Sequence, residues 1–126
     1  MANDLKLYQQ AVDKGNELNA REQYGKAVSA FRIALGEIKN RPEVYIGLGE
    51  ACIGQKKYSR ALDCYKMASR LSRGKIDPLA KVSDLQERLG QLNDAARTYM
   101  AIGEIYFSQR DNEAAISNWE RATRLD

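Results

Sequence analysis

The sequence predicts an all-α protein, an α-solenoid built from stacked pairs of antiparallel helices. Apolar residues recur at helical spacing along nearly the whole chain, and no strand-like alternation of apolar and polar residues interrupts them. The 126 residues include only two prolines and nine glycines, a composition that favours helices. A pattern of small and aromatic residues also recurs at a fixed interval along the chain, as a repeat architecture requires.

The apolar periodicity predicts seven helices joined by short breaks. Pro42 and Pro78 are each expected to stand at the start of a helix, with Asp77 as the N-cap of the second of these. Gly90 suits a helix end, and Asp111 can cap the last helix. The expected helices cover residues 3–19, 23–39, 43–55, 57–72, 77–89, 92–109 and 112–124.

The repeated pattern joins small residues to aromatic ones at fixed spacing. Gly15 and Gly49 are separated by the same interval as the aromatic residues Tyr24 and Tyr58. Two antiparallel helices need small residues where their backbones approach, so we expect each glycine to face an alanine of the second helix. One such hairpin cannot bury its apolar face alone, so several copies must stack. The matched positions are Tyr24, Ala27, Phe31 and Ala34 in the first copy, and Tyr58, Ala61, Tyr65 and Ala68 in the second.

These residues resemble the signature of the tetratricopeptide repeat, which places a bulky residue, a Leu-Gly pair and an aromatic on one helix, then alanine and an aromatic on the next. The interval between the copies is also the length of that repeat, about 34 residues. The resemblance implies a right-handed superhelix of helix pairs. Two stretches carry it best: Tyr45, Leu48, Gly49 and Cys52 followed by Ala61, Tyr65 and Ala68, and Tyr99, Ile102, Gly103 and Tyr106 followed by Ala115, Trp119 and Ala122.

The copies do not tile the chain evenly. We expect one domain over residues 1–126, with repeats near 8–41, 42–75 and 76–109 and an overlapping copy at 96–126. The helix at 92–109 would then close the third hairpin and open the fourth. The last helix is expected to leave one side of Trp119 uncovered, which makes self-association through this helix a possibility.

The residue types argue against catalysis and against bound cofactors. There is no histidine, and Cys52 and Cys64 suit packing thiols of a reducing compartment. Asp84 and Glu87 share a helix face with Lys81 and Arg88, which favours a solvated, ion-paired surface over an acid pair. No phosphate-binding glycine motif and no metal-binding constellation occurs. The sequence therefore predicts a non-enzymatic protein without catalytic, cofactor or metal sites.

Targeting signals are also missing from the sequence. The first residues lack a basic region followed by an apolar run, and no stretch approaches the length of apolar sequence that spans a membrane. We therefore expect a cytoplasmic protein that does not contact membranes.

Basic side chains gather in the middle of the chain, where residues 42–75 carry seven basic and three acidic side chains. This cluster, at 56–75, makes a nucleic-acid-associated helical repeat the alternative function. The aromatic residues occupy repeat core positions and are not free to stack on bases, so we expect no such binding at physiological ionic strength. A further alternative is a structural segment of a larger repeat array.

The resemblance implies a function in protein recognition, because the first helices of such repeats line a concave groove that takes peptides. Their residues here mix apolar side chains with carboxylates, which favours a peptide or protein partner with apolar and basic residues. A clamp for a C-terminal carboxylate is not expected: Asn16 matches it, but Val12, Gly47 and Asp77 replace its polar or basic residues. The expected groove residues are Val12, Asn16, Asn19, Ile46, Glu50, Ile53, Asp84, Glu87, Arg88, Met100, Glu104 and Phe107.

Overall fold

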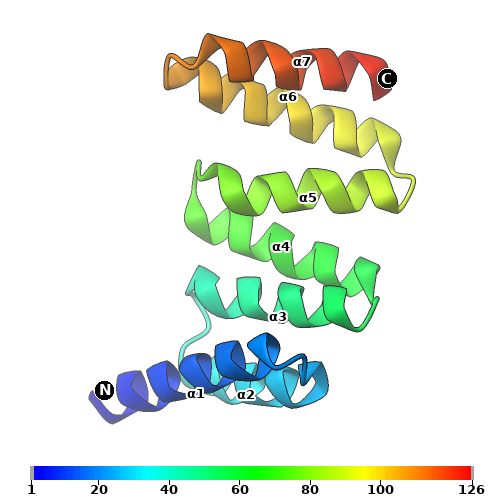
Figure 1. The fold of residues 1–126 in the computed structure, drawn as a ribbon. Helices are drawn as coiled ribbons and strands as arrows, with labels where there is room; N and C mark the ends of the chain where they lie inside the picture. The colour runs from blue at the N-terminus through cyan, green and yellow to red at the C-terminus, as the bar shows by residue number, and fades with distance from the viewer. Residues whose placement is uncertain (1, 126) are drawn as a thin grey trace. The chain divides into compact units, whose positions relative to one another are not determined.

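The computed structural model describes residues 2–125, with side chains from residue 4 onward. These residues form seven α-helices and no strand, so the predicted all-α helical-repeat fold is confirmed (Figure 1). Each helix begins and ends close to its expected bounds. The helices are α1 (Ala2–Ala20), α2 (Tyr24–Glu37), α3 (Pro42–Gly54), α4 (Tyr58–Ser72), α5 (Ile76–Arg88), α6 (Leu92–Ser108) and α7 (Asn112–Leu125).

The chain divides into two compact units. The first unit, Met1–Leu71, contains α1, α2, α3 and nearly all of α4, and the second, Ser72–Asp126, contains α5, α6 and α7. In the first unit α1 and α2 lie side by side and α3 packs on both of them. In the second unit α6 packs between α5 and α7.

The helix ends follow the expected signals with one exception. Pro42 opens α3 after the extended residue Arg41. The N–H of Ala114 donates to Oδ1 of Asp111 at 3.1 Å, which confirms Asp111 as a cap of α7. Asp77, however, is not the N-cap of α5, because the helix begins at Ile76 after the extended residue Lys75. Pro78 tolerates this shift, since no residue of the first helical turn needs its N–H for the helix.

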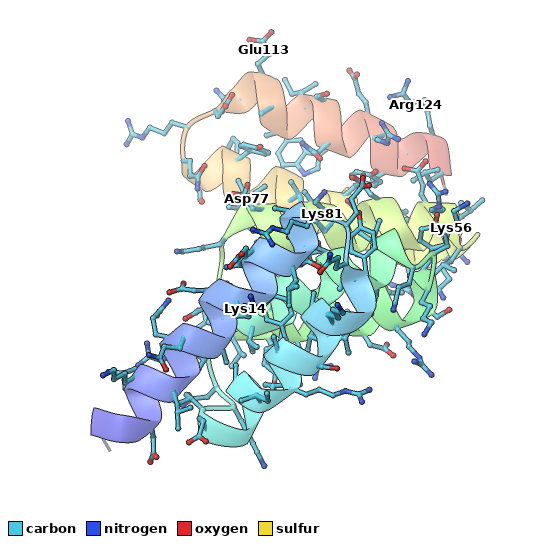
Figure 2. All side chains as sticks on the ribbon, turned by 60° about the horizontal axis from the view of Figure 1, so that its bottom comes forward. Lys14, Lys56, Asp77, Lys81, Glu113 and Arg124 are labelled. Atoms are coloured by element: carbon cyan, nitrogen blue, oxygen red, sulfur yellow. The ribbon has the colours of Figure 1, made fainter. Side chains whose placement is uncertain are left out.

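The charges of α7 suit the helix dipole. Glu113 lies in its first turn and Arg124 in its last turn, and both side chains point into solvent (Figure 2). A carboxylate near the N-terminus and a guanidinium near the C-terminus each stabilise a helix.

The same turn closes four successive helix pairs. One residue of each turn has a left-handed backbone: Glu22 at φ 60°, Lys56 at φ 61°, Gly90 at φ 76° and Arg110 at φ 63°. The N–H of the following residue donates to a carbonyl in the last turn of the preceding helix, at 2.8–2.9 Å in all four turns. The first three turns follow each other at one repeat length, whereas Arg110 follows Gly90 after a much shorter interval. Helix α6 therefore closes one hairpin and opens the next.

The core of the first unit is organised around aromatic rings that lie on glycines. A Cβ atom on Gly15 would stand 2.6 Å from the ring of Phe31, and one on Gly47 would also collide with that ring. The atoms nearest to a Cβ on Gly49 belong to the ring of Tyr65. The missing Cβ makes room for a ring, and the fully buried alanines let the helix backbones approach.

The second unit shows the same packing with different residues at the equivalent positions. Gly103 lies under the indole of Trp119, with the carbonyl oxygen of Ala115 also close by. In the hairpin of α5 and α6 the equivalent position is taken by Ser83, which is buried and donates from Oγ to the carbonyl of Ala80 at 2.8 Å. This bond satisfies the buried hydroxyl within its own helix.

Candidate functional site

Three of the expected groove residues line one hollow in the first unit. Asn16 and Asn19 come from α1 and Glu50 comes from α3, while Ala20 and Tyr24 complete the wall. Asn16 and Glu50 are exposed. The hollow therefore presents an amide and a carboxylate to solvent from two neighbouring helices.

The side chain of Asn19 is fixed in place by a contact between helices. Its Nδ2 donates to the carbonyl oxygen of Gly47 at 3.0 Å, which joins α1 to α3. Its Oδ1 is buried without a hydrogen-bond partner in the described part of the chain. Because Gly47 itself lies against Phe31, this bond ties one wall of the hollow to the core.

Helix α3 contributes a continuous face beside the hollow. Ile46, Glu50 and Ile53 follow each other at intervals of four and three residues and so share one side of the helix. The two isoleucines are half-buried and Glu50 is exposed, so a carboxylate stands between two apolar side chains. Val12, in contrast, is only 3% exposed and belongs to the core. Its side chain is therefore not part of the surface that the sequence predicted.

In the second unit, the expected groove residue Glu87 contacts Tyr99, which the sequence predicted only as a residue of the repeat signature, and Arg121, which the sequence did not point to. The hydroxyl of Tyr99 donates to Oε1 of Glu87 at 2.7 Å and lies 3.3 Å from Oδ1 of Asp84. Arg121 of α7 donates to the same Oε1 of Glu87 from Nε at 3.1 Å and from Nη2 at 2.9 Å. Its guanidinium also lies 5.1 Å from the centre of the Tyr99 ring.

This cluster shifts the titration of its members. The hydrogen bond from Tyr99, together with Arg121, lowers the pKa of the Glu87 carboxyl. Burial and the neighbouring Glu87 raise the pKa of Tyr99 to about 12. Glu87 therefore serves to join α5, α6 and α7, whereas Asp84 remains exposed at the edge of the cluster. Arg88 is also exposed on α5.

The remaining expected residues lie on α6. Glu104 is exposed, and Met100 lines a shallow hollow with residues of α7 such as Ala122 and Thr123. Phe107 is 58% exposed, and its ring centre lies 5.8 Å from that of Trp119. These side chains thus form an apolar surface along α6 and α7 that carries one carboxylate.

Metal chemistry and membrane insertion find no support in residues 2–125. No group of three or more Cys, Asp or Glu side chains lies close enough within this range to hold a metal ion. No helix there combines the length and apolar character that crossing a membrane requires.

Hairpins that share one turn and one glycine–aromatic contact define an α-helical repeat protein. The sequence model of the tetratricopeptide repeat matches residues 96–126, a range that includes α7 and most of α6. This match is to one part of the chain, and the solved structures described below share its fold. No curated protein matches the sequence.

Solved structures share the fold at low sequence identity. The second tetratricopeptide domain of human RPAP3, solved with an HSP70 peptide, is similar with a TM-score of 0.76 and 16% identity over 95% of this chain and 98% of that one. The Sgt2 tetratricopeptide domain from Aspergillus fumigatus has a TM-score of 0.73 and 16% identity, over 93% of this chain and 77% of that one. The HSP90-bound domain of yeast Sti1 has a TM-score of 0.77 and 12% identity, over 94% of this chain and 47% of that one.

Proposed function

We propose that this chain is a non-enzymatic protein-interaction module that binds a peptide on the side of α1 and α3 where Asn16, Asn19 and Glu50 meet. The observation that carries the proposal is the hollow that these three side chains line. Two of the similar structures are described as complexes with HSP70 or HSP90 partners, which supports peptide recognition by this kind of fold.

The chemistry of the surface favours a peptide with both apolar and basic residues. Glu50 stands between Ile46 and Ile53, so an arginine or lysine flanked by apolar anchors would complement this face.

The ligand of this module should differ from that of the human domain. The HSP70 peptide in that structure has the acidic sequence SGPTIEEVD. The exposed Glu50 would repel such a peptide, and the hydrogen bond to Gly47 occupies the Asn19 amide. We therefore expect peptides of the SGPTIEEVD type to bind to this hollow more weakly than a basic, apolar peptide of equal length.

A peptide-display selection on the purified protein tests the proposal, followed by fluorescence anisotropy with the selected peptide. We expect basic, apolar sequences to be enriched, and Glu50→Lys to weaken binding by about tenfold or more. The matched control is Glu37→Lys. It makes the same change in charge at the end of α2, outside the residues that line the hollow.

Two results would count against the proposal. One is a selection that yields no basic, apolar peptide whose binding Glu50→Lys weakens. The other is an equal loss of affinity in the control variant, which would mean that only the net charge of the protein matters.

A further inference from the structure

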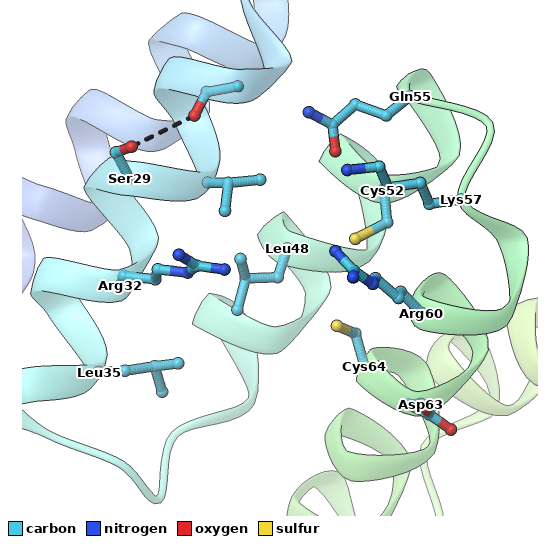
Figure 3. Close-up of a pocket in the computed structure, with 12 residues that line it drawn as sticks. Ser29, Arg32, Leu35, Leu48, Cys52, Gln55, Lys57, Arg60, Asp63 and Cys64 are labelled. Carbon is cyan, nitrogen blue, oxygen red and sulfur yellow. Dashed lines mark hydrogen bonds between the residues drawn. The ribbon is translucent and has the colours of Figure 1, made fainter.

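A second hollow lies in the first unit on the opposite side of α3. Helix α3 contributes Leu48 and Cys52 to it, and these two residues stand about 200° around the helix from Glu50, since each residue turns an α-helix by about 100°. Helices α2 and α4 form its walls. Figure 3 shows Arg32 and Arg60 extending toward Leu48 from opposite sides. This hollow is therefore separate from the peptide surface proposed above.

The rim of the hollow is cationic. Arg32 comes from α2, Lys57 from the turn before α4, and Arg60 from α4, and all three are exposed. Asp63 is the one acidic side chain among the lining residues. None of the three cations is held in an ion pair within residues 2–125. Three cations against one carboxylate leave the rim with a net positive charge, which attracts anions.

The floor of the hollow is apolar and uncharged. It is formed by half-buried aliphatic side chains and by the thiols of Cys52 and Cys64. Burial, with Cys52 beside it, raises the pKa of the Cys64 thiol to about 12, so Cys64 carries no charge at neutral pH. The aliphatic residues are Val28, Leu35 and Leu48.

We propose that this hollow is a second interaction site, which binds an acidic peptide segment with one apolar side chain. The apolar side chain would contact Leu48 and Cys52, while carboxylates before and after it would pair with Arg32 and Arg60. An apolar floor below a cationic rim is complementary to an apolar side chain that stands between carboxylates.

The same observations favour a peptide over a nucleic acid. The lining residues include no aromatic side chain on which a base could stack. Three cations would neutralise only a few phosphates, and such binding falls steeply as salt rises. An apolar floor adds nothing to phosphate recognition, whereas it adds affinity for an aliphatic side chain.

The test uses a fluorescein-labelled synthetic peptide, a leucine flanked on each side by two glutamates, and measures anisotropy in low and physiological salt. We expect Arg32→Gln with Arg60→Gln to weaken binding by about tenfold, since two charge-assisted contacts are lost. Lys26→Gln with Arg70→Gln should change it by less than about twofold, because this pair removes the same charge from α2 and α4 outside the hollow. Replacing the leucine of the probe by glycine should also weaken binding.

Photocrosslinking locates the bound peptide independently. A probe that carries photo-leucine in place of its leucine should crosslink to residues that line the hollow, such as Leu48 and Cys52, as located by mass spectrometry. Crosslinks confined to other parts of the chain would place the peptide elsewhere and overturn the proposal. Equal loss in both variant pairs would also overturn it. So would a single-stranded oligonucleotide that binds more tightly than the peptide through Arg32 and Arg60, because the site would then be one for nucleic acid.

Discussion

The ring of Tyr65 in α4 lies directly on Gly49 in α3, so closely that a Cβ atom at residue 49 would stand 2.5 Å from the ring. The same sequence spacing between glycine and ring recurs in the pairs Gly15–Phe31 and Gly103–Trp119. This contact fixes how closely the two helices of each hairpin approach. It also explains why three hairpins have glycine at this position and why the hairpin of α5 and α6 has the small residue Ser83.

Gly49→Ala should therefore destabilise the protein. The added methyl group forces the buried ring of Tyr65 to move, which costs about 1–3 kcal/mol in free energy of unfolding. Urea denaturation followed by circular dichroism measures the change. Gly36→Ala in α2 is the matched control, because nothing lies within 4 Å of a Cβ there, and the lower entropy of alanine should stabilise the helix by roughly 0.5–1 kcal/mol. Equal effects of both substitutions would contradict the proposed contact.

The left-handed turns lead to a second prediction, in which stability should rise. Lys56 adopts φ 61°, a left-handed backbone conformation that glycine adopts more easily because it has no Cβ. Lys56→Gly should therefore stabilise the protein by about 1 kcal/mol. Gly90 stands at the equivalent place of the next hairpin with φ 76°, and Gly90→Ala should destabilise by a similar amount, about 1 kcal/mol. Thermal melts of both variants check the opposite signs. A loss of stability in Lys56→Gly would mean that the Lys56 side chain matters more than its backbone strain.

The sequence predicted the repeat well because the helix contacts depend on few residue types. Glycines, alanines and rings at fixed spacing identified seven helices and the double role of the segment that becomes α6. The capping error at Asp77 has a local cause, since an acidic residue serves equally well as an N-cap or within the first turn.

The candidate site was harder to predict, because it depends on which side chains meet across helices. Val12 fits the helical spacing of a groove residue, yet packing against neighbouring helices buries it. Arg121 gave no signal of its own, although it follows Glu87 by one repeat length. The hollow around Arg32 and Arg60 joins residues from α2 and α4, which no local pattern connects.

The cluster at Glu87 predicts a pH-dependent contribution to stability. Its pKa is lowered in the folded protein, so the contribution is present above the unfolded pKa and is lost as pH falls through the folded pKa. Glu87→Gln should lower the free energy of unfolding at pH 7 by up to about 1 kcal/mol, and this loss should be smaller at about pH 3, because protonation of the carboxyl removes the charge that pairs with Arg121. Chemical denaturation at both pH values measures this, with the exposed Glu120→Gln as control. An effect of equal size at both pH values would point to lost packing and not to lost charge.

The apolar surface of the second unit leads to the last prediction, which concerns self-association. Ile116 of α7 is 51% exposed, Phe107 is 58% exposed, and Trp119 is only half-buried, whereas the equivalent ring of Phe31 is fully covered. Neighbouring exposed apolar side chains favour association, so we expect the apparent mass to rise with protein concentration in sedimentation experiments. Ile116→Glu should weaken this association by about tenfold, because a carboxylate would have to lose its hydration in the contact.

Ile33→Glu provides the control, since Ile33 is a similarly exposed isoleucine, 57% exposed, on α2 of the first unit. If both isoleucine variants weaken association equally, the contact does not lie on α7. If the parent protein stays monomeric at all concentrations, the exposed side chains of α6 and α7 do not bind a second copy.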